Sequence, residues 1–145
     1  MKFKNLILIF VILFCFSCTK ELSENNIKEK SLDLQVLEAY EEGIEYLEDG
    51  DAIFAAKKFN EAEILFPQSS WAPKSALMAA YAYYTQNYLD DTIAELERFI
   101  RIYPTHENID YAYFLIANSY YEKIVDEKKD LGPLLKAQEK FNFIV

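Results

Sequence analysis

Few residues in this chain have the type and spacing that chemistry requires, and the most suggestive pair is Cys15 and Cys18. Their C-x-x-C spacing is that of a redox dithiol or of half a zinc site. However, no second ligand pair follows, and both thiols come directly after an apolar run over residues 6–14. Such a run after Lys2 and Lys4 describes a secretory signal, and it is shorter than the roughly 20 apolar residues of a transmembrane helix. The cysteines therefore indicate targeting more strongly than catalysis.

The end of the apolar run resembles a bacterial lipobox. Ser17 directly precedes Cys18, which would be acylated and become the mature N-terminus. Cys15 stands where a lipobox usually has Leu, so simple signal cleavage that leaves a free Cys18 thiol remains the alternative. Thr19 is not the Asp that retains some lipoproteins in the inner membrane, so the sequence favours delivery to the outer membrane. We expect Cys18 to be the lipidation site.

The remaining polar residues do not form a catalytic or metal-binding set. His106 is the single histidine and lies between two expected helices, where a capping or packing role is ordinary. Solvated charge explains the carboxylates spaced along one helix face, which are Glu41, Glu42, Glu45 and Glu48. No Gly-rich phosphate loop, nucleophile elbow or Ser/His/Asp set is present in the sequence. We therefore expect no enzyme activity, no metal site and no cofactor.

The composition is that of an acidic helical protein with ample material for a core. The 145 residues are 52% hydrophobic and 16% aromatic, with 3 Gly and 4 Pro. This disfavours a disordered chain or a β protein with many hairpins. The formal charge is −9, and removal of a signal that holds Lys2 and Lys4 changes it to −11. So acidic a surface repels phosphate backbones, and we expect no nucleic-acid partner.

The helices expected in this chain come from a sequence repeat of about 34 residues. A frame that starts at Val36 places small, aromatic and proline residues at positions 8, 11, 15, 20, 24, 27 and 32, namely Gly43, Tyr46, Gly50, Ala55, Phe59, Ala62 and Pro67. These are the characteristic places of the tetratricopeptide repeat (TPR), a pair of antiparallel helices. Small residues let the two helices approach, large ones fill the space between them, and a left-handed residue at position 15 ends the first helix.

Two further frames follow the first. The second starts at Pro73 and keeps six of these places, at Ala80, Tyr83, Asn87, Thr92, Leu96 and Pro104. An insertion over residues 70–72 precedes it, in which Ser70 suits an N-cap while Pro73 suits the first turn of the helix. The third frame starts at Asp110 and lacks a closing proline and a polar capping helix. Because solenoid ends need a polar cap, we expect a longer natural protein cut short.

The sequence therefore predicts an all-α, TPR-type α-solenoid without strands. Six helices are expected, over residues 33–49, 52–66, 73–86, 89–102, 109–124 and 133–145. The chain divides into a lipoprotein signal peptide (1–17), a lipidated N-terminus with a flexible tether (18–31), TPR 1 (32–69), TPR 2 (70–107) and an incomplete TPR 3 (108–145).

In a TPR array the first helix of each pair lines a concave groove. The groove positions of the three frames are rich in aromatic rings, and the predicted peptide-binding residues are Tyr40, Ile44, Leu77, Tyr81, Tyr84, Tyr111, Phe114, Asn118 and Tyr121. Each aromatic side chain that a bound peptide buries contributes about 1.5–3 kcal/mol. The alternative is that several of these tyrosines pack between neighbouring repeats.

One stretch resembles a known family. The run Arg-Phe-Ile-Arg-Ile-Tyr-Pro-Thr-His from Arg98 to His106, followed by residues 108–114, is similar to the most distinctive segment of the BamD/ComL family of outer-membrane assembly lipoproteins. Residues 67–72 and 81–84 resemble earlier segments of that family. The likeness spans residues 34–145 and includes the lipobox and tether in the same order.

The resemblance implies a non-enzymatic lipoprotein, anchored by lipid to the periplasmic face of the outer membrane, within the β-barrel assembly machinery. It implies partners in unfolded barrel precursors, the central barrel subunit and other assembly lipoproteins. The family has five repeats, of which this chain covers about two and a half. Its amino-terminal repeats are associated with the targeting strand of incoming barrel proteins. The alternative is a periplasmic TPR scaffold for cell-wall or pilus assembly.

Overall fold

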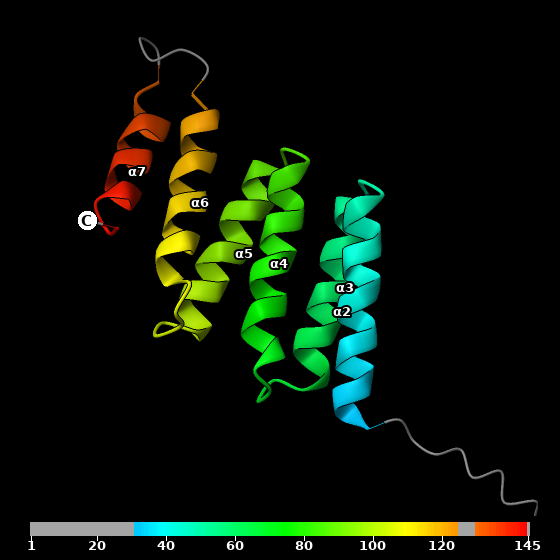
Figure 1. Cartoon of the computed structure of the whole chain (residues 1–145). Coiled ribbons are helices and arrows are strands. Elements are labelled where there is room, and N and C mark those ends of the chain that lie inside the picture. The colour runs from blue at the N-terminus through cyan, green and yellow to red at the C-terminus, as the bar shows by residue number, and fades with distance from the viewer. Residues whose placement is uncertain (1–30, 125–129, 145) are drawn as a thin grey trace, which may run out of the picture.

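A computed structural model of the chain describes residues 31–124 and 130–144. Within these residues the structure is all-α, with six helices and no strand, as predicted (Figure 1). The helices are α2 (Leu32–Glu48), α3 (Ala52–Leu65), α4 (Trp71–Thr85), α5 (Leu89–Ile102), α6 (Ile109–Glu122) and α7 (Gly132–Phe141). The predicted signal peptide, Cys18 and all of the tether but its last residue lie outside the described residues.

The helices form three antiparallel pairs that stand in a row in chain order (Figure 1). Each helix packs on the next one, and in addition α2 contacts α4 and α4 contacts α6. By contrast, no Cα atom of α3 comes within 8 Å of a Cα atom of α5. Because α2, α4 and α6 lie closer together than the helices behind them, the array curves toward these three. This side is called the concave face below.

Close approach within the first pair depends on a glycine. A Cβ atom built on Gly43 would lie 2.7 Å from Cε1 of Phe59, closer than side chains tolerate. Gly43 is buried in α2, and Phe59, which is fully buried in α3, fills the space. These are positions 8 and 24 of the repeat, so the packing predicted from their sizes is confirmed.

The turn between the two helices of a pair also follows the repeat pattern. Gly50 and Asn87 both stand at position 15, and they have positive φ angles of 79° and 62°. Glycine adopts this left-handed region without steric cost, and asparagine tolerates it better than most residues. Both residues therefore let the chain reverse after the first helix of a pair.

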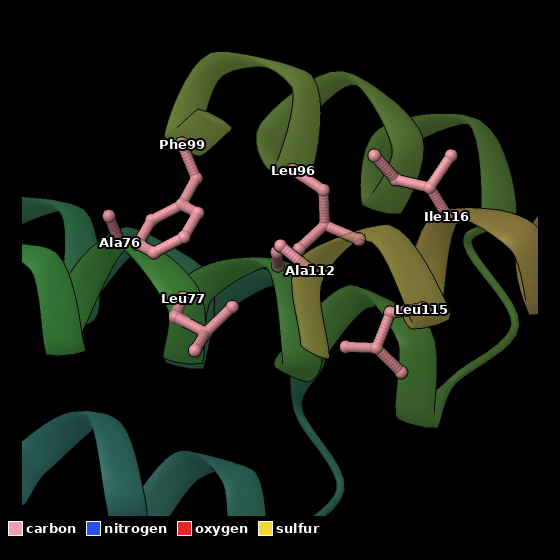
Figure 2. Close-up of a cluster of buried hydrophobic side chains, with 8 residues drawn as sticks. Ala76, Leu77, Leu96, Phe99, Ala112, Leu115 and Ile116 are labelled. Atoms are coloured by element: carbon pink, nitrogen blue, oxygen red, sulfur yellow. The ribbon is translucent and has the colours of Figure 1, made fainter. Parts of the chain in front are cut away.

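The second and third pairs share one buried cluster (Figure 2). Leu96 and Phe99 of α5 point toward α4, where Phe99 lies beside Ala76, and both are fully buried. Ala112 and Ile116 of α6 belong to the same cluster, which therefore joins three consecutive helices. Contacts of this kind make each pair depend on the next one for its core.

Most helices differ from the prediction by one or two residues at an end, and the end of α7 differs by more. The helix α4 begins at Trp71 rather than at Pro73, and the Ser70 side chain makes no capping hydrogen bond. Pro73 remains within the first turn, where a missing N–H costs nothing because the helix offers it no acceptor. The helix α7 ends at Phe141 and not at residue 145. After Phe141 the amides of Phe143 and Ile144 bond to carbonyls three residues back, which tightens the chain into turns.

The close contact at Gly43 predicts that replacing this glycine by alanine destabilises the protein, although the same change usually stabilises a helix. A glycine-to-alanine change inside a helix normally stabilises by about 1 kcal/mol through helix propensity. We expect Gly43→Ala instead to lower the free energy of unfolding by about 1–3 kcal/mol, because the new methyl group meets the Phe59 ring. Urea unfolding followed by circular dichroism measures the change.

Glu45→Ala, at an exposed site on the same helix, is the matched control and should stay within about 0.5 kcal/mol of the parent. The double variant Gly43→Ala/Phe59→Leu should recover part of the loss. A net stabilisation by Gly43→Ala alone would contradict the packing described here.

Candidate functional site

The nine residues predicted to bind peptide lie on the three helices of the concave face. The structure distributes them over α2 (Tyr40, Ile44), α4 (Leu77, Tyr81, Tyr84) and α6 (Tyr111, Phe114, Asn118, Tyr121). They differ in how much surface each leaves free. The face therefore divides into exposed, half-buried and buried groups, which have different capacities for binding.

The most accessible rings are on α6. Tyr111 is 41% exposed, Phe114 is 43% exposed and Tyr121 is 62% exposed. The rings of Tyr111 and Phe114 stack with centroids 6.3 Å apart, and Phe114 meets the edge of Phe141 of α7 at 6.4 Å. Tyr121 borders a hollow of about 400 Å³ whose wall also includes Leu134 and Phe141. Together these side chains form a continuous aromatic surface that a ligand can reach.

Tyrosine hydroxyls gather between α4 and α6. Tyr84 donates a hydrogen bond of 2.7 Å to Oε1 of Glu122, and this bond together with burial raises the pKa of Tyr84 to about 12. Burial, with a smaller effect from Tyr81, raises the pKa of Tyr111. Tyr81 and Tyr84 also rest partly buried on the core cluster of Figure 2. The Tyr111 hydroxyl therefore stays protonated at neutral pH and can donate to a carbonyl of an extended chain, whereas the Tyr84 hydroxyl already donates its single proton to Glu122.

Other predicted residues are held inside the protein. Leu77 is only 8% exposed and belongs to the core, packed with Leu96 and Leu115, so it presents little surface to a ligand. This corrects its predicted place in the groove.

The half-buried Tyr40 ring lies 5.2 Å from the Phe59 ring, and burial raises the pKa of Tyr40. Part of the Tyr40 ring therefore packs inside the protein, which is the alternative role that the sequence left open for some of these tyrosines.

Trp71 was not among the predicted site residues, although it lines the concave face. A hollow of about 410 Å³ lies between α2 and Trp71, lined by Leu37, Tyr40, Glu41, Ile44, Glu45 and Trp71. The centroid of the Trp71 ring is 5.0 Å from that of Tyr40. A signal was available in the sequence, since the single tryptophan falls in the insertion that precedes the second repeat.

An ion pair between a buried glutamate and a partly exposed arginine joins the first and second repeats on the opposite face. Glu63 of α3 is only 7% exposed and receives two hydrogen bonds from the Arg98 guanidinium, of 2.7 and 2.9 Å. The Tyr103 hydroxyl donates a third bond of 2.8 Å to Glu63. Arg98 also bonds to Glu95 and Asn60. We call these five residues the Glu63 clamp.

The acid–base properties of the clamp follow from this geometry. Hydrogen bonding to Glu63 is the largest cause that raises the pKa of Arg98, so the guanidinium stays charged. Burial, followed by the bond to Glu63, raises the pKa of Tyr103 to about 12. Arg98 therefore stays charged and Tyr103 stays neutral near neutral pH. Together with Glu63 they bridge helices whose backbones do not touch.

The remaining candidates for chemistry have structural roles. His106 accepts a hydrogen bond of 3.2 Å from the Asn108 amide at Nδ1, and its ring meets the edge of Phe99 at 5.5 Å. The expected capping and packing role of His106 is confirmed.

In the described ranges, no three His, Cys, Asp or Glu side chains come together as a metal site requires. Among the helices of those ranges, none is both long and apolar enough to cross a bilayer.

A known protein family matches the whole of the described helical array. The family model YfiO, described as "Outer membrane lipoprotein", matches residues 32–145 and so includes every described helix. The chain belongs to this family. The resemblance carried by the run from Arg98 to His106 is thereby confirmed at the level of the family.

Three relatives illustrate that the matched region is a small part of the longer proteins. The outer membrane protein assembly factor BamD of Caulobacter vibrioides is 37% identical over 91 residues, which is 63% of this chain and 30% of that protein. Its counterpart in Neisseria gonorrhoeae is 33% identical over 99 residues, or 68% of this chain and 37% of that protein. The match to the Rickettsia prowazekii protein is 29% over 106 residues, or 73% and 42%. The chain thus spans about a third of the length of the curated relatives it matches.

The clamp can be tested by removing one charge. We expect Glu63→Gln to lower the free energy of unfolding by about 2 kcal/mol, because Arg98 loses its buried counter-charge but keeps Glu95 as a partner. Tyr103→Phe, which deletes one hydrogen bond, should cost about 1 kcal/mol. Chemical denaturation measures both variants.

Glu61→Gln is the matched control, since Glu61 is exposed on the same helix and pairs with Lys58 at the surface. It should cost less than about 0.5 kcal/mol. Equal losses for Glu61→Gln and Glu63→Gln would show that the clamp does not hold the two repeats together.

Proposed function

We propose that this chain is a non-enzymatic lipoprotein of the outer-membrane β-barrel assembly machinery. In this role its concave face binds the targeting peptides of unfolded barrel proteins, the central barrel subunit, or both. Membership of the outer membrane lipoprotein family supports the proposal, as does the name of the relatives, outer membrane protein assembly factor. Because the chain spans only part of those relatives, the activity is assigned to the repeats it contains.

One observation carries the proposal: the exposed rings of α6. Tyr111, Phe114 and Tyr121 are each at least 41% exposed and belong to α6, one of the three helices of the concave face. Large aromatic side chains with free surface are enriched at binding hot spots, where full burial contributes about 1.5–3 kcal/mol each. The Tyr111 phenol adds a hydrogen-bond donor on the same helix. An extended apolar and aromatic polypeptide fits such a surface.

The proposal includes a membrane anchor. Acyl chains on Cys18 would hold the protein on the periplasmic face of the outer membrane, and residues 18–31 would act as a tether for the three TPR units. Two or more chains give stable attachment, whereas one gives only marginal binding. Other assembly lipoproteins and the membrane itself are then natural neighbours.

Peptide binding provides the direct test. A labelled peptide that ends in phenylalanine should bind the chain, and fluorescence anisotropy should show at least a fivefold loss of affinity for Phe114→Ala and for Tyr121→Ala. Fivefold corresponds to about 1 kcal/mol, the usual threshold for a contributing contact residue. Asn118→Ala should have a smaller effect, because an amide buries little apolar surface.

The matched control is Ile64→Ala, which truncates a side chain that is 74% exposed on the opposite face. It should change the affinity by less than twofold. If Ile64→Ala weakens the peptide as much as Phe114→Ala does, the concave face is not the binding surface. A pull-down with this protein that recovers no barrel-forming partner would contradict the proposed membership of the machinery.

A further inference from the structure

The hollow between α2 and Trp71 combines apolar walls with an acidic rim. Leu37, Tyr40, Ile44 and Trp71 supply the apolar walls of this volume of about 410 Å³. Glu41 and Glu45 also line it, and both are exposed. Its size lies within the range of about 300–1,000 Å³ that is typical of ligand pockets.

The walls are preformed by packing. Tyr40 lies between the fully buried Phe59, at a centroid distance of 5.2 Å, and Trp71, at 5.0 Å. The ammonium group of Lys74 lies 5.4 Å from the centroid of the Trp71 ring and helps to hold the indole. An incoming side chain therefore meets rings that are already ordered, which reduces the entropic cost of binding.

The rim carries negative charge that no lysine or arginine neutralises within the described part of the chain. Glu41 and Glu45 form no ion pair there, whereas the neighbouring Glu42 pairs with Lys58 on the other side of α2. Lys74 is not among the residues that line the hollow. Since Glu41 and Glu45 are one helical turn apart, their carboxylates lie on the same side of α2.

We propose that this hollow receives an aromatic side chain of an extended polypeptide that carries lysine or arginine two positions away. The inference rests on the proposed function, because the occupant is a segment of the polypeptide bound on the concave face. Residues two apart in an extended strand point to the same side, about 7 Å from each other. An aromatic residue and a cationic residue at this spacing therefore both face the hollow and its rim.

Charge complementarity selects the cationic occupant. With the aromatic ring against Trp71, the neighbouring ammonium or guanidinium group reaches the Glu41 and Glu45 carboxylates at the rim. A glutamate at the same place would add a third negative charge and be repelled. The hollow therefore provides sequence preference, whereas the rings of α6 provide general affinity for aromatic segments.

Trp71 is the single tryptophan of the chain, and its fluorescence reports directly on the hollow. The probes are three amidated peptides that differ only in the residue two positions from a central phenylalanine: lysine, alanine or glutamate. At low ionic strength we expect the lysine peptide to bind at least fivefold more tightly than the glutamate peptide, with a change in Trp71 emission. Added salt should reduce the difference, because it screens exposed charges.

Glu41→Gln/Glu45→Gln should reduce the lysine-to-glutamate preference to less than twofold. Glu42→Gln, on the same helix but outside the hollow, should keep the preference. Binding of all three peptides with equal affinity and unchanged Trp71 emission would overturn this inference and leave the proposed function standing. If none of the aromatic peptides binds, both fail.

Discussion

The carboxylate of Glu63, buried between two hairpins, is the contact on which the shape of the array most depends. It accepts both arms of the Arg98 guanidinium and the Tyr103 hydroxyl, and so joins α3 to α5 on the side where the backbones are far apart. On the other side α2, α4 and α6 touch directly. A side-chain bridge on one face and backbone contact on the other produce curvature, and curvature brings the aromatic residues of three helices onto one wall.

The sequence run that resembles the BamD/ComL family has a physical explanation in this junction. Arg98 and Tyr103 bind Glu63, Phe99 fills the core between α4 and α6, and the His106 ring packs on Phe99. All four therefore serve the contact between repeats. The residues that determine what each repeat binds can therefore lie elsewhere, on the concave helices, and can differ from one repeat to the next. A distinctive motif in a solenoid can thus specify geometry without touching a ligand.

The repeat register predicted the helices and their close contacts well, because Gly43, Gly50 and Phe59 act through size and backbone freedom that local sequence specifies. It predicted less about individual site residues. Leu77 stands at a groove position, but α5 and α6 cover it with the core cluster of Figure 2. Trp71 enters the wall because the insertion lengthens α4 at its start. The burial of Leu77 and the position of Trp71 both depend on how neighbouring repeats pack. The residue pattern of a single 34-residue repeat does not specify that packing.

In the proposed function, the concave face is the surface that binds another polypeptide. A photoreactive phenylalanine analogue is placed at Tyr121 on that face, or at Ile64 on the opposite face, and the protein is mixed with an unfolded outer-membrane barrel precursor. Both positions are well exposed, at 62% and 74%, so accessibility alone does not favour the first. We predict strong cross-links from position 121 and few from position 64. Equal cross-linking from the two positions, or stronger cross-linking from position 64, would contradict the account.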